Sequence, residues 1–396
     1  MKSKIIGLAL LVVTAATVLY YPALNAGDRE TGKRIDQLVH ATQKPVVDVV
    51  FVLDTTGSMS GLIQTAKEKI WSIASTMASA QPTPDIRIGL VGYRDLGDEY
   101  VTRVVDLDGN LDSVYAALME FQAGGGGDTP ESVNQALYEA VHNMSWSQRD
   151  QAYQVIFLVG DAPPHMDYNE VRYPAIVAAA KEKGIVINTI QCGELASTID
   201  PWTAIANLGG GNFFQVEQGG GAVAYETPFD EKIAALSARL DKTRLYFGTE
   251  EELQKAQLKM DAAAEIDATA SVASRARRGV FNAGAGGREN LLGDKELVAA
   301  VTSGEVTLEE LDEDALPEVL RPMAPAAQAA YVGQLADERA DLQTRIRQLA
   351  DERNRFIARK VEAAGGLDDS LDKRLYETVK TQAGEAGFEY EGGPEY

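Results

Sequence analysis

The stretch Val46–Asp54, VVDVVFVLD, decides the fold class of this 396-residue chain. Its nearly unbroken run of β-branched and apolar residues is typical of a strand that is buried on both faces of a sheet. The segment Ser60–Ala80 follows, and its apolar residues recur every three or four positions along one helix face: Leu62, Ala66, Ile70, Ile73 and Met77. A buried strand followed directly by an amphipathic helix indicates the first unit of a parallel sheet.

The same alternation of strand and helix continues to about residue 245. Further strands are predicted at Ile86–Tyr93, Val101–Leu107, Gln154–Gly160, Ile185–Ile190 and Asn212–Val216, and the short, polar second one is expected at an edge. Helix patterns lie between and after them, at Leu111–Phe121, Val133–Met144, Asn169–Lys183, Trp202–Leu208 and from about Asp230 to Leu245. Strands that alternate with helices predict an α/β fold with a doubly wound, mostly parallel sheet.

After residue 245 the sequence changes to helix-forming residues without strand patterns. Thr249–Arg278 is rich in Ala, Glu and Lys, and Asn282–Arg288 (NAGAGGR) is a Gly-rich break. Residues 246–300 are therefore expected to form a helical and Gly-rich connector, and residues 301–396 an acidic, helical C-terminal region.

A long helix is predicted at Gln328–Ala364, with an apolar residue every seven positions: Leu335, Leu342, Leu349 and Phe356. Such a repeat favours a coiled-coil seam through which the chain would form a homo-oligomer. The second seam position is interrupted, because Ile346 fits it but Arg339 and Arg353 do not. A helical hairpin that packs on its own chain therefore stays open as the alternative.

The first 26 residues carry the pattern of an export signal. Lys2 and Lys4 precede an apolar run from Ile5 to Leu24. That run approaches the ~20 residues of a membrane helix, so an uncleaved N-terminal anchor is the alternative to a cleaved signal peptide. Residues 27–44 are expected to be a polar linker. Either outcome predicts an exported protein of the periplasm or cell envelope, with a membrane tether if the segment is retained.

The charge balance excludes one class of partner. The chain has 59 Asp and Glu against 37 Lys and Arg, a formal net charge of -22. Because phosphate contacts need a basic face, nucleic acid is not expected as a main partner. Cys192 is the single cysteine, so no disulfide can form within the chain, and we expect it to be a buried small apolar residue.

Three separated sequence pieces place polar side chains directly after predicted strands or in a Gly-rich loop. They are Asp54–Ser58 (DTTGS), Thr129 within Gly124–Pro130 (GGGGDTP), and Asp161 after the strand that ends at Gly160. Ligands of an open parallel sheet bind beyond the carboxyl ends of its strands, and the glycines allow a tight turn. We therefore expect five side chains to meet at one site: Asp54, Thr56, Ser58, Thr129 and Asp161.

These side chains offer only hard oxygen ligands, two carboxylates and three hydroxyls. Such a set suits Mg²⁺, with Mn²⁺ or Ca²⁺ as alternatives. Ser58 lies at the start of the following helix, where free backbone N–H groups favour an anion. A metal with an open position there would bind an acidic group of a protein or surface ligand. No nucleophile or general base is needed, so we expect a binding module without catalytic residues.

Asp54–Ser58, Gly126–Glu131 (GGDTPE) and Asp161–Pro164 (DAPP) resemble the metal-ion-dependent adhesion site of von Willebrand factor A domains. The resemblance implies such a domain over residues 45–245, and an exported bacterial protein that carries it. It also implies that Ser58 and Thr56 contact the metal directly, Thr129 directly or through water, and Asp54 and Asp161 mostly through water.

Other polar residues near these pieces are expected to be structural. Glu131 is expected to be an acid of the first turn of a helix rather than a ligand. His165 is expected to be a solvated loop side chain, with contact to a partner as the alternative. Arg94 and Asp95 are expected to form an ion pair that braces the loops, with contact to a partner as the alternative. The basic residues Arg275, Arg277 and Arg278 are expected to dock on the acidic stretch Glu305–Asp314.

Two other functions use the same residues. Asp54 could be the nucleophile of a Mg²⁺-dependent phosphoryl-transfer enzyme. The sequence lacks the second Asp that such sites need two residues on, because Thr56 stands there, and it lacks an acidic pair after Asp161. The other alternative is an envelope scaffold in which the C-terminal region sets the oligomeric state.

Overall fold

The computed structural model describes residues 44–127, 129–216, 225–363 and 371–390. By its contacts the chain divides into residues 1–44 and residues 45–396. The signal peptide or anchor expected at 1–26 lies outside the described residues, as does the linker expected at 27–44 except for Lys44. Within the described ranges, no helix combines the length and the apolar character that a membrane span requires.

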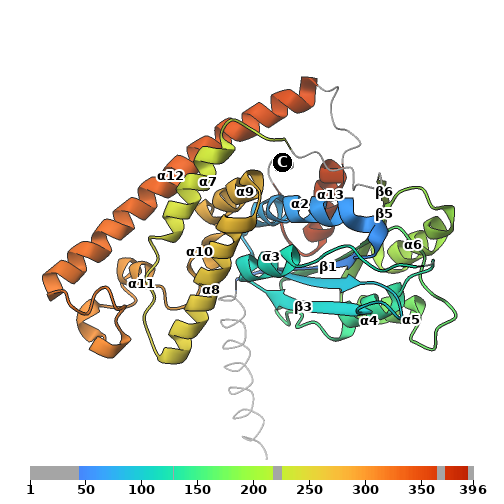
Figure 1. Ribbon diagram of the computed structural model, residues 1–396, viewed down its shortest axis with the longest axis horizontal. Coiled ribbons are helices and arrows are strands. Elements are labelled where there is room, and N and C mark those ends of the chain that lie inside the picture. Colours follow the sequence, from blue (N-terminus) through green and yellow to red (C-terminus); the bar gives the residue numbers. More distant parts are fainter. Residues whose placement is uncertain (1–43, 128, 217–224, 364–370, 391–396) are drawn as a thin grey trace, which may run out of the picture. The chain divides into compact units, whose positions relative to one another are not determined.

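A six-stranded sheet with the order β3-β2-β1-β4-β5-β6 forms the centre of residues 45–396 (Figure 1). Its strands are β1 (Val46–Asp54), β2 (Asp85–Tyr93), β3 (Thr102–Asp108), β4 (Ala152–Gly160), β5 (Ile185–Cys192) and β6 (Gly210–Val216). Each neighbouring pair is parallel except β2 and β3. The predicted α/β fold is confirmed, and β3 is the edge strand that its polar sequence predicted.

Helices cover both faces of this sheet. They are α2 (Ser60–Ala78) and α3 (Leu111–Met119) on one face, and α4 (Val133–His142), α5 (Tyr173–Glu182) and α6 (Ala196–Leu208) on the other. Strand β1 shows why its sequence is apolar on both faces: Val47 and Val49 pack on the α2 face, and Val50 and Val52 on the α4 face. Cys192 is buried on the α2 face, as predicted.

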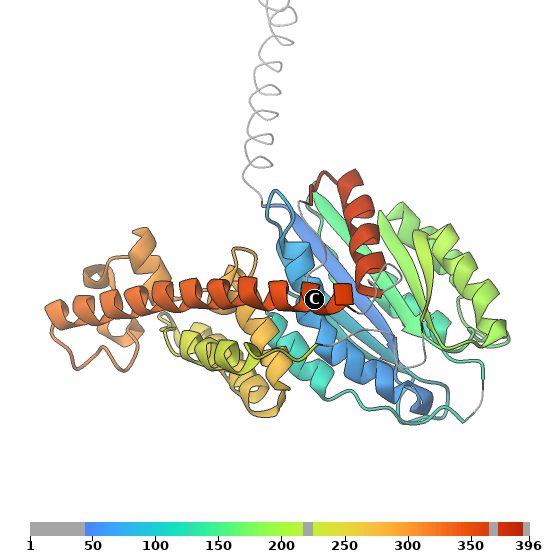
Figure 2. The same cartoon turned by 90° about the horizontal axis from the view of Figure 1, so that it is seen from above.

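The end of the chain completes the α2 face of the sheet (Figure 2). Helix α13 (Leu371–Glu385) and the residues after it bring five buried side chains into the same core: Tyr376, Val379, Ala383, Phe388 and Tyr390. Gln382 and Asn188 of β5 exchange two amide hydrogen bonds of 3.0 and 2.9 Å. The core of the sheet thus extends beyond the expected 45–245 segment, and the division of residues 45–396 into domains stays a prediction.

The remaining helices form a second, helical part. They are α7 (Asp230–Asp241), α8 (Glu250–Thr269), α9 (Val272–Ala283), α10 (Arg288–Leu292), α11 (Leu297–Ser303) and α12 (Pro325–Ala363), with the short 3₁₀ turns η2 (Leu308–Glu310) and η3 (Glu313–Ala315). Thr249–Arg278, which was expected to be helical, contains two helices, α8 and α9. The break lies at Ala270–Ser271, where the Ser271 hydroxyl caps α9 by accepting from the Ser274 N–H at 3.1 Å.

The long helix α12 packs on its own chain, against α7 and α9 (Figure 2). Its residues Leu342 and Ile346 are fully buried there. Arg339 and Arg353, which interrupt the apolar repeat, are also buried and form ion pairs with Glu296 at 2.8 Å and Asp230 at 2.9 Å. The intramolecular alternative is therefore the one observed, and an oligomer through α12 is left as a proposal.

Two of the three arginines of the basic cluster on α9 pair outside the acidic stretch Glu305–Asp314, contrary to the prediction. Arg275 pairs with Asp267 at 3.1 Å. Arg278 contacts Asp112 at the start of α3 and Asp241 at the end of α7, at 2.6 and 2.7 Å. Burial acts to raise the pKa of Asp112, but the charge and hydrogen bonds of Arg278 together hold it below its usual value. A buried carboxylate without a cation costs more free energy than an exposed one, and this explains why Arg278 pairs with Asp112.

Candidate metal centre

The loop after β1 gathers Asp54, Thr56 and Ser58 at the carboxyl end of the sheet. Oδ1 of the fully buried Asp54 accepts the Thr56 N–H at 2.9 Å and the Thr56 hydroxyl at 2.6 Å. The Thr56 and Ser58 hydroxyls lie 3.3 Å apart. The turn Gly57–Met59 leads directly into α2, so the Ser58 side chain lies beside the first N–H groups of a 19-residue helix. Three of the predicted ligands therefore lie together, and their role as ligands stays a prediction.

The glycine-rich loop is fastened to this turn by its backbone. Gly57 N–H donates to the Gly125 carbonyl at 3.2 Å, and Gly124 N–H donates to the Thr55 carbonyl at 3.1 Å. Gly126 has a φ of 72°, and a Cβ on it would lie 2.8 Å from the Thr56 Cβ. Only glycine allows the loop to approach Thr56 this closely.

Asp161 joins the site from the end of β4, the strand next to β1. Its backbone N–H is hydrogen-bonded to Asp54, and its carboxylate is close enough to raise the pKa of Asp54. Its carbonyl accepts from the Thr198 hydroxyl at 2.8 Å, and Trp202 Nε1 donates to the carbonyl of Ala162 at 3.0 Å. Helix α6 thus fixes the loop that carries Asp161.

Thr129, a predicted ligand, and Glu131, which was predicted to be structural, differ in how far they are buried. Thr129 is exposed. Glu131 is only 3% exposed, and its Oε1 lies 3.3 Å from where a Cβ on Gly126 would be. Helix α4 begins at Val133, so Glu131 precedes it and the first-turn prediction was wrong. The sequence signal that could have pointed to Glu131 as a residue of the site is the Asp-Thr-Pro-Glu string, because its proline ends the loop just before Glu131.

The site is electrostatically negative. Burial raises the pKa of Asp54 to about 7, with the Asp161 charge adding to the rise and the Thr56 hydrogen bonds opposing it. Burial raises the pKa of Glu131 to about 9, helped by the charges of Asp54, Asp95, Asp98 and Asp161. Asp54 Oδ2 and Glu131 Oε2 are both buried without a hydrogen-bond partner. Carboxylates in this position are stabilised by a cation.

The donor set fits a divalent cation of the hard type, since carboxylate and hydroxyl oxygens are what Mg²⁺, Mn²⁺ and Ca²⁺ prefer. Within the part of the chain that the structure describes, no three His, Cys, Asp or Glu side chains are placed to hold a metal ion by themselves. The hydroxyls of Thr56 and Ser58 lie beside Asp54, and Mg²⁺ characteristically keeps several water ligands.

A polar network braces the loops around the centre, although not by the expected Arg94–Asp95 pair. Arg94 pairs with Glu99 at 3.2 Å and donates to the carbonyls of Thr55 and Gln122 at 3.2 and 2.8 Å. Asp95 accepts from the hydroxyls of Ser132 at 2.8 Å and Tyr168 at 2.9 Å.

His165 belongs to the same network. It is buried, stacks on Tyr168 with ring centroids 3.7 Å apart, and has Nε2 at 3.4 Å from Asp95. The prediction of a solvated histidine was therefore wrong, because the apolar face of its ring packs on an aromatic neighbour that sequence spacing did not reveal.

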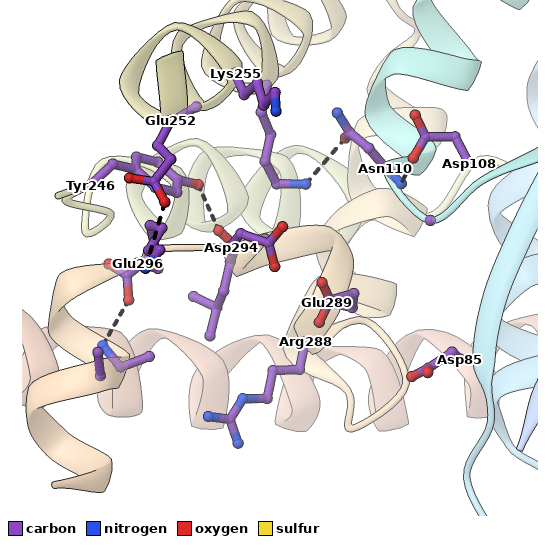
Figure 3. A pocket seen from close by; sticks show the side chains of 18 of the residues that line it. Asp85, Asp108, Asn110, Tyr246, Glu252, Lys255, Arg288, Glu289, Asp294 and Glu296 are labelled. Atoms are coloured by element: carbon purple, nitrogen blue, oxygen red, sulfur yellow. Dashed lines mark hydrogen bonds and ion pairs between the residues drawn. The ribbon is translucent and has the colours of Figure 1, made fainter. Parts of the chain in front are cut away.

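A separate cavity of about 870 Å³ lies between the sheet and the helical part (Figure 3). It is lined by charged residues of both signs, among them Asp85, Arg288, Glu289 and Asp294. Lys259 is buried there and donates to Asn110 Oδ1 at 3.1 Å. The cavity contains none of the five predicted metal ligands and is distinct from the centre described above.

The part of the chain that forms the sheet matches a known protein family. Residues 48–218 match the family model described as von Willebrand factor A domain. Two curated relatives are an ariadne-like RING finger protein of Acanthamoeba polyphaga mimivirus, 29% identical over 31% of this chain, and alpha-protein kinase vwkA of Dictyostelium discoideum, 30% identical over 30%. The matches span only 12% and 19% of the length of these relatives.

Among solved structures, proximal thread matrix protein 1 from the mussel byssus, with zinc in its metal-ion-dependent adhesion site, is 17% identical. The match covers 44% of this chain and 42% of that one, with a TM-score of 0.33. The six-stranded, mostly parallel sheet with helices on both faces is a von Willebrand factor A-like fold, and it lies almost entirely within the residues that match this family model.

Proposed function

We propose that this chain is a non-catalytic binding protein whose A domain holds Mg²⁺, with Mn²⁺ or Ca²⁺ as alternatives, and recognises a protein or surface ligand through it. The observation that carries the proposal is the state of Asp54. One of its oxygens accepts from the Thr56 backbone N–H and hydroxyl, and the other is buried without a partner. This observation supports the proposal that the metal is held by Asp54, Thr56, Ser58, Thr129 and Asp161.

An acidic group is the proposed partner chemistry. Ser58 lies at the start of α2, and the unpaired N–H groups and dipole of that helix favour a negative charge there. A partner carboxylate that completes the metal coordination would lie at the same place.

Burial argues against the phosphoryl-transfer alternative. Asp54 has no exposed surface, and a nucleophilic carboxylate must reach the phosphorus of its substrate in line. A metal ligand needs no such access.

The location of the protein is proposed from its N-terminal pattern. The basic start and apolar run of residues 1–26 support export to the periplasm or cell envelope, with a membrane tether if the segment is not cleaved. Fractionation of cells tests this proposal, and recovery of the full-length chain in the cytoplasm would refute it.

Titration of the full chain with Mg²⁺ in a calorimeter tests the metal centre. We expect saturable binding that is lost in Asp54→Ala and kept in the matched control Asp200→Ala, an exposed carboxylate on α6. Unchanged Mg²⁺ binding by Asp54→Ala would refute the metal centre. A ligand protein that stays bound in excess EDTA would remove the metal from recognition.

A further inference from the structure

The cavity between the sheet and the helical part has the size of a small-molecule site (Figure 3). Its volume is about 870 Å³, and pockets that bind small molecules measure about 300–1,000 Å³. Residues at the start of β2 and at the end of β3 line it. Because β2 runs parallel to β1, and Asp54 lies where β1 ends, the cavity is at the opposite end of the strands from the metal centre.

Lys259 of α8 is a buried cation in the wall of this cavity. It is only 6% exposed, its Nζ donates to Asn110 Oδ1 at 3.1 Å, and no carboxylate of the described residues forms an ion pair with it. Asn110 is held in this orientation because its Nδ2 donates to the Ser113 hydroxyl at 2.6 Å. A buried ammonium group whose acceptor is a neutral amide is costly, and an anion in the cavity would offset that cost.

The surrounding structure keeps Lys259 in this position. Gly293 has a φ of 61°, and a Cβ on it would lie 3.2 Å from Cδ and Cε of Lys259, so the lysine stem packs closely on the backbone there. The charge of Asp112 acts on Lys259, but both oxygens of that carboxylate are bound by Arg278 at 2.6 Å. Burial lowers the pKa of Lys259. Lys259 therefore lines the cavity with an ammonium group that no carboxylate of its own chain contacts.

The exposed part of the lining is mainly acidic. Four exposed carboxylates have no ion-pair partner in the part of the chain that the structure describes: Asp108, Glu289, Asp294 and Glu305. Arg288 is the one exposed cation of the lining that is likewise unpaired within those residues. Figure 3 shows Glu289 and Asp294 in the same part of the cavity. These carboxylates would repel a purely anionic ligand, and Lys259 would repel a purely cationic one.

We propose that this cavity binds a small zwitterion of the size of a short peptide, whose carboxylate pairs with Lys259 and whose ammonium group pairs with Glu289. Glu289 is close enough to Lys259 for its charge to raise the pKa of the lysine, but the two form no ion pair. A ligand that carries both charges satisfies both residues at once. The site would be separate from the metal centre and would not depend on its occupancy.

The test is a calorimetric titration of the full chain with triglycine and two matched probes, in EDTA so that a metal-bound carboxylate does not contribute. N-acetyltriglycine keeps the carboxylate and lacks the ammonium group, whereas triglycinamide keeps the ammonium group and lacks the carboxylate. We expect triglycine to bind, and triglycinamide to bind at least about thirtyfold more weakly because it leaves the buried lysine without an anion. N-acetyltriglycine should bind about two- to fivefold more weakly, because Glu289 is exposed.

Two variants assign the two charges of the probe. Lys259→Met keeps an apolar stem and should lower the affinity for triglycine by at least about thirtyfold. Glu289→Gln should weaken triglycine about two- to fivefold and leave N-acetyltriglycine unchanged. The control Lys181→Met removes an exposed lysine on α5, outside the lining, and should bind triglycine like the wild type.

Unfolding without probe separates a binding residue from a structural one. Because Lys259→Met removes a buried charge without an ion pair, it should unfold at the same temperature as the wild type or a higher one. A lower unfolding temperature together with lost binding would overturn the role of Lys259. No binding of triglycine by the wild type, equal affinity for all three probes, or wild-type affinity in Lys259→Met would overturn the proposal.

Discussion

Single residues decide how the loops of the metal centre can approach each other. Gly126 has a positive φ and almost touches Thr56, whereas its neighbour Gly127 has open space around its Cβ position. The sequence alone does not distinguish the two glycines. The folded structure shows that position 126 must be glycine, whereas position 127 has room for a side chain.

Gly126→Ala is expected to displace the glycine-rich loop from Thr56 and to weaken Mg²⁺ binding by at least tenfold. The left-handed backbone alone costs a non-glycine residue about 1–2 kcal/mol, and the 2.8 Å approach to the Thr56 Cβ adds a steric clash. Calorimetric titration measures the effect. The control Gly127→Ala should bind Mg²⁺ normally, and equal affinities in both variants would contradict the packing described for this loop.

The raised pKa values of Asp54, about 7, and Glu131, about 9, predict the pH dependence of metal-free stability. A carboxyl that holds its proton more tightly in the folded than in the unfolded state destabilises the fold as it ionises. Stability in EDTA should therefore fall as pH rises from about 4, the unfolded value, through the folded values. Thermal unfolding at several pH values measures this, and a saturating Mg²⁺ concentration should reduce the slope. A metal-free stability that rises over the same range would contradict the burial of these carboxyls.

At the scale of elements, one arginine joins three helices. Arg278 of α9 binds Asp112 of α3 with both its Nε and Nη2, each at 2.6 Å, and also binds Asp241 of α7. The side chains of Arg278 and Asp112 are 4% and 0% exposed. The contact therefore links a helix of the sheet to the helical part through a desolvated ion pair.

Arg278→Met is expected to destabilise the protein by about 3–5 kcal/mol, because it leaves Asp112 buried without its cation. The matched control Arg345→Met removes one partner of an exposed pair with Asp341 on α12, for which a loss of about 0.5 kcal/mol or less is expected. Denaturant unfolding of both variants provides the comparison. Similar losses in the two would show that burial does not set the strength of the Arg278 contact.

The strands could be predicted because their signals are local. Val46–Asp54 and Ile185–Ile190 are apolar runs of β-branched residues, and the observed strands begin at the same residues. The partners of charged residues could not be predicted, because Arg339 and Arg353 meet Glu296 and Asp230 only after α12 has packed. The prediction for Glu131 was wrong for the same reason, since the burial of its side chain depends on the distant loop after β4.

At the scale of the whole molecule, the far end of the chain belongs to the core of the sheet. Phe388 is 2% exposed and lies in the same cluster as Val47 and Trp71. Residues more than 300 positions apart thus share one core, and nothing in the local pattern of the C-terminal sequence marked it as part of the sheet.

Phe388→Ala is expected to cost about 3–5 kcal/mol, the usual range for a buried phenylalanine. Glu385→Ala, three residues earlier and exposed, should change stability by about 0.5 kcal/mol or less. Thermal and denaturant unfolding of the full chain measure both. A Phe388→Ala variant as stable as the control would show that the C-terminal segment is not needed to complete the sheet.

The docking of α13 on the sheet has a consequence for biosynthesis. Helix α13 leaves the ribosome long after β1, so the part of the sheet that α13 covers stays open while the residues between them are being synthesised. A product that stops early would keep apolar side chains exposed to proteases and chaperones.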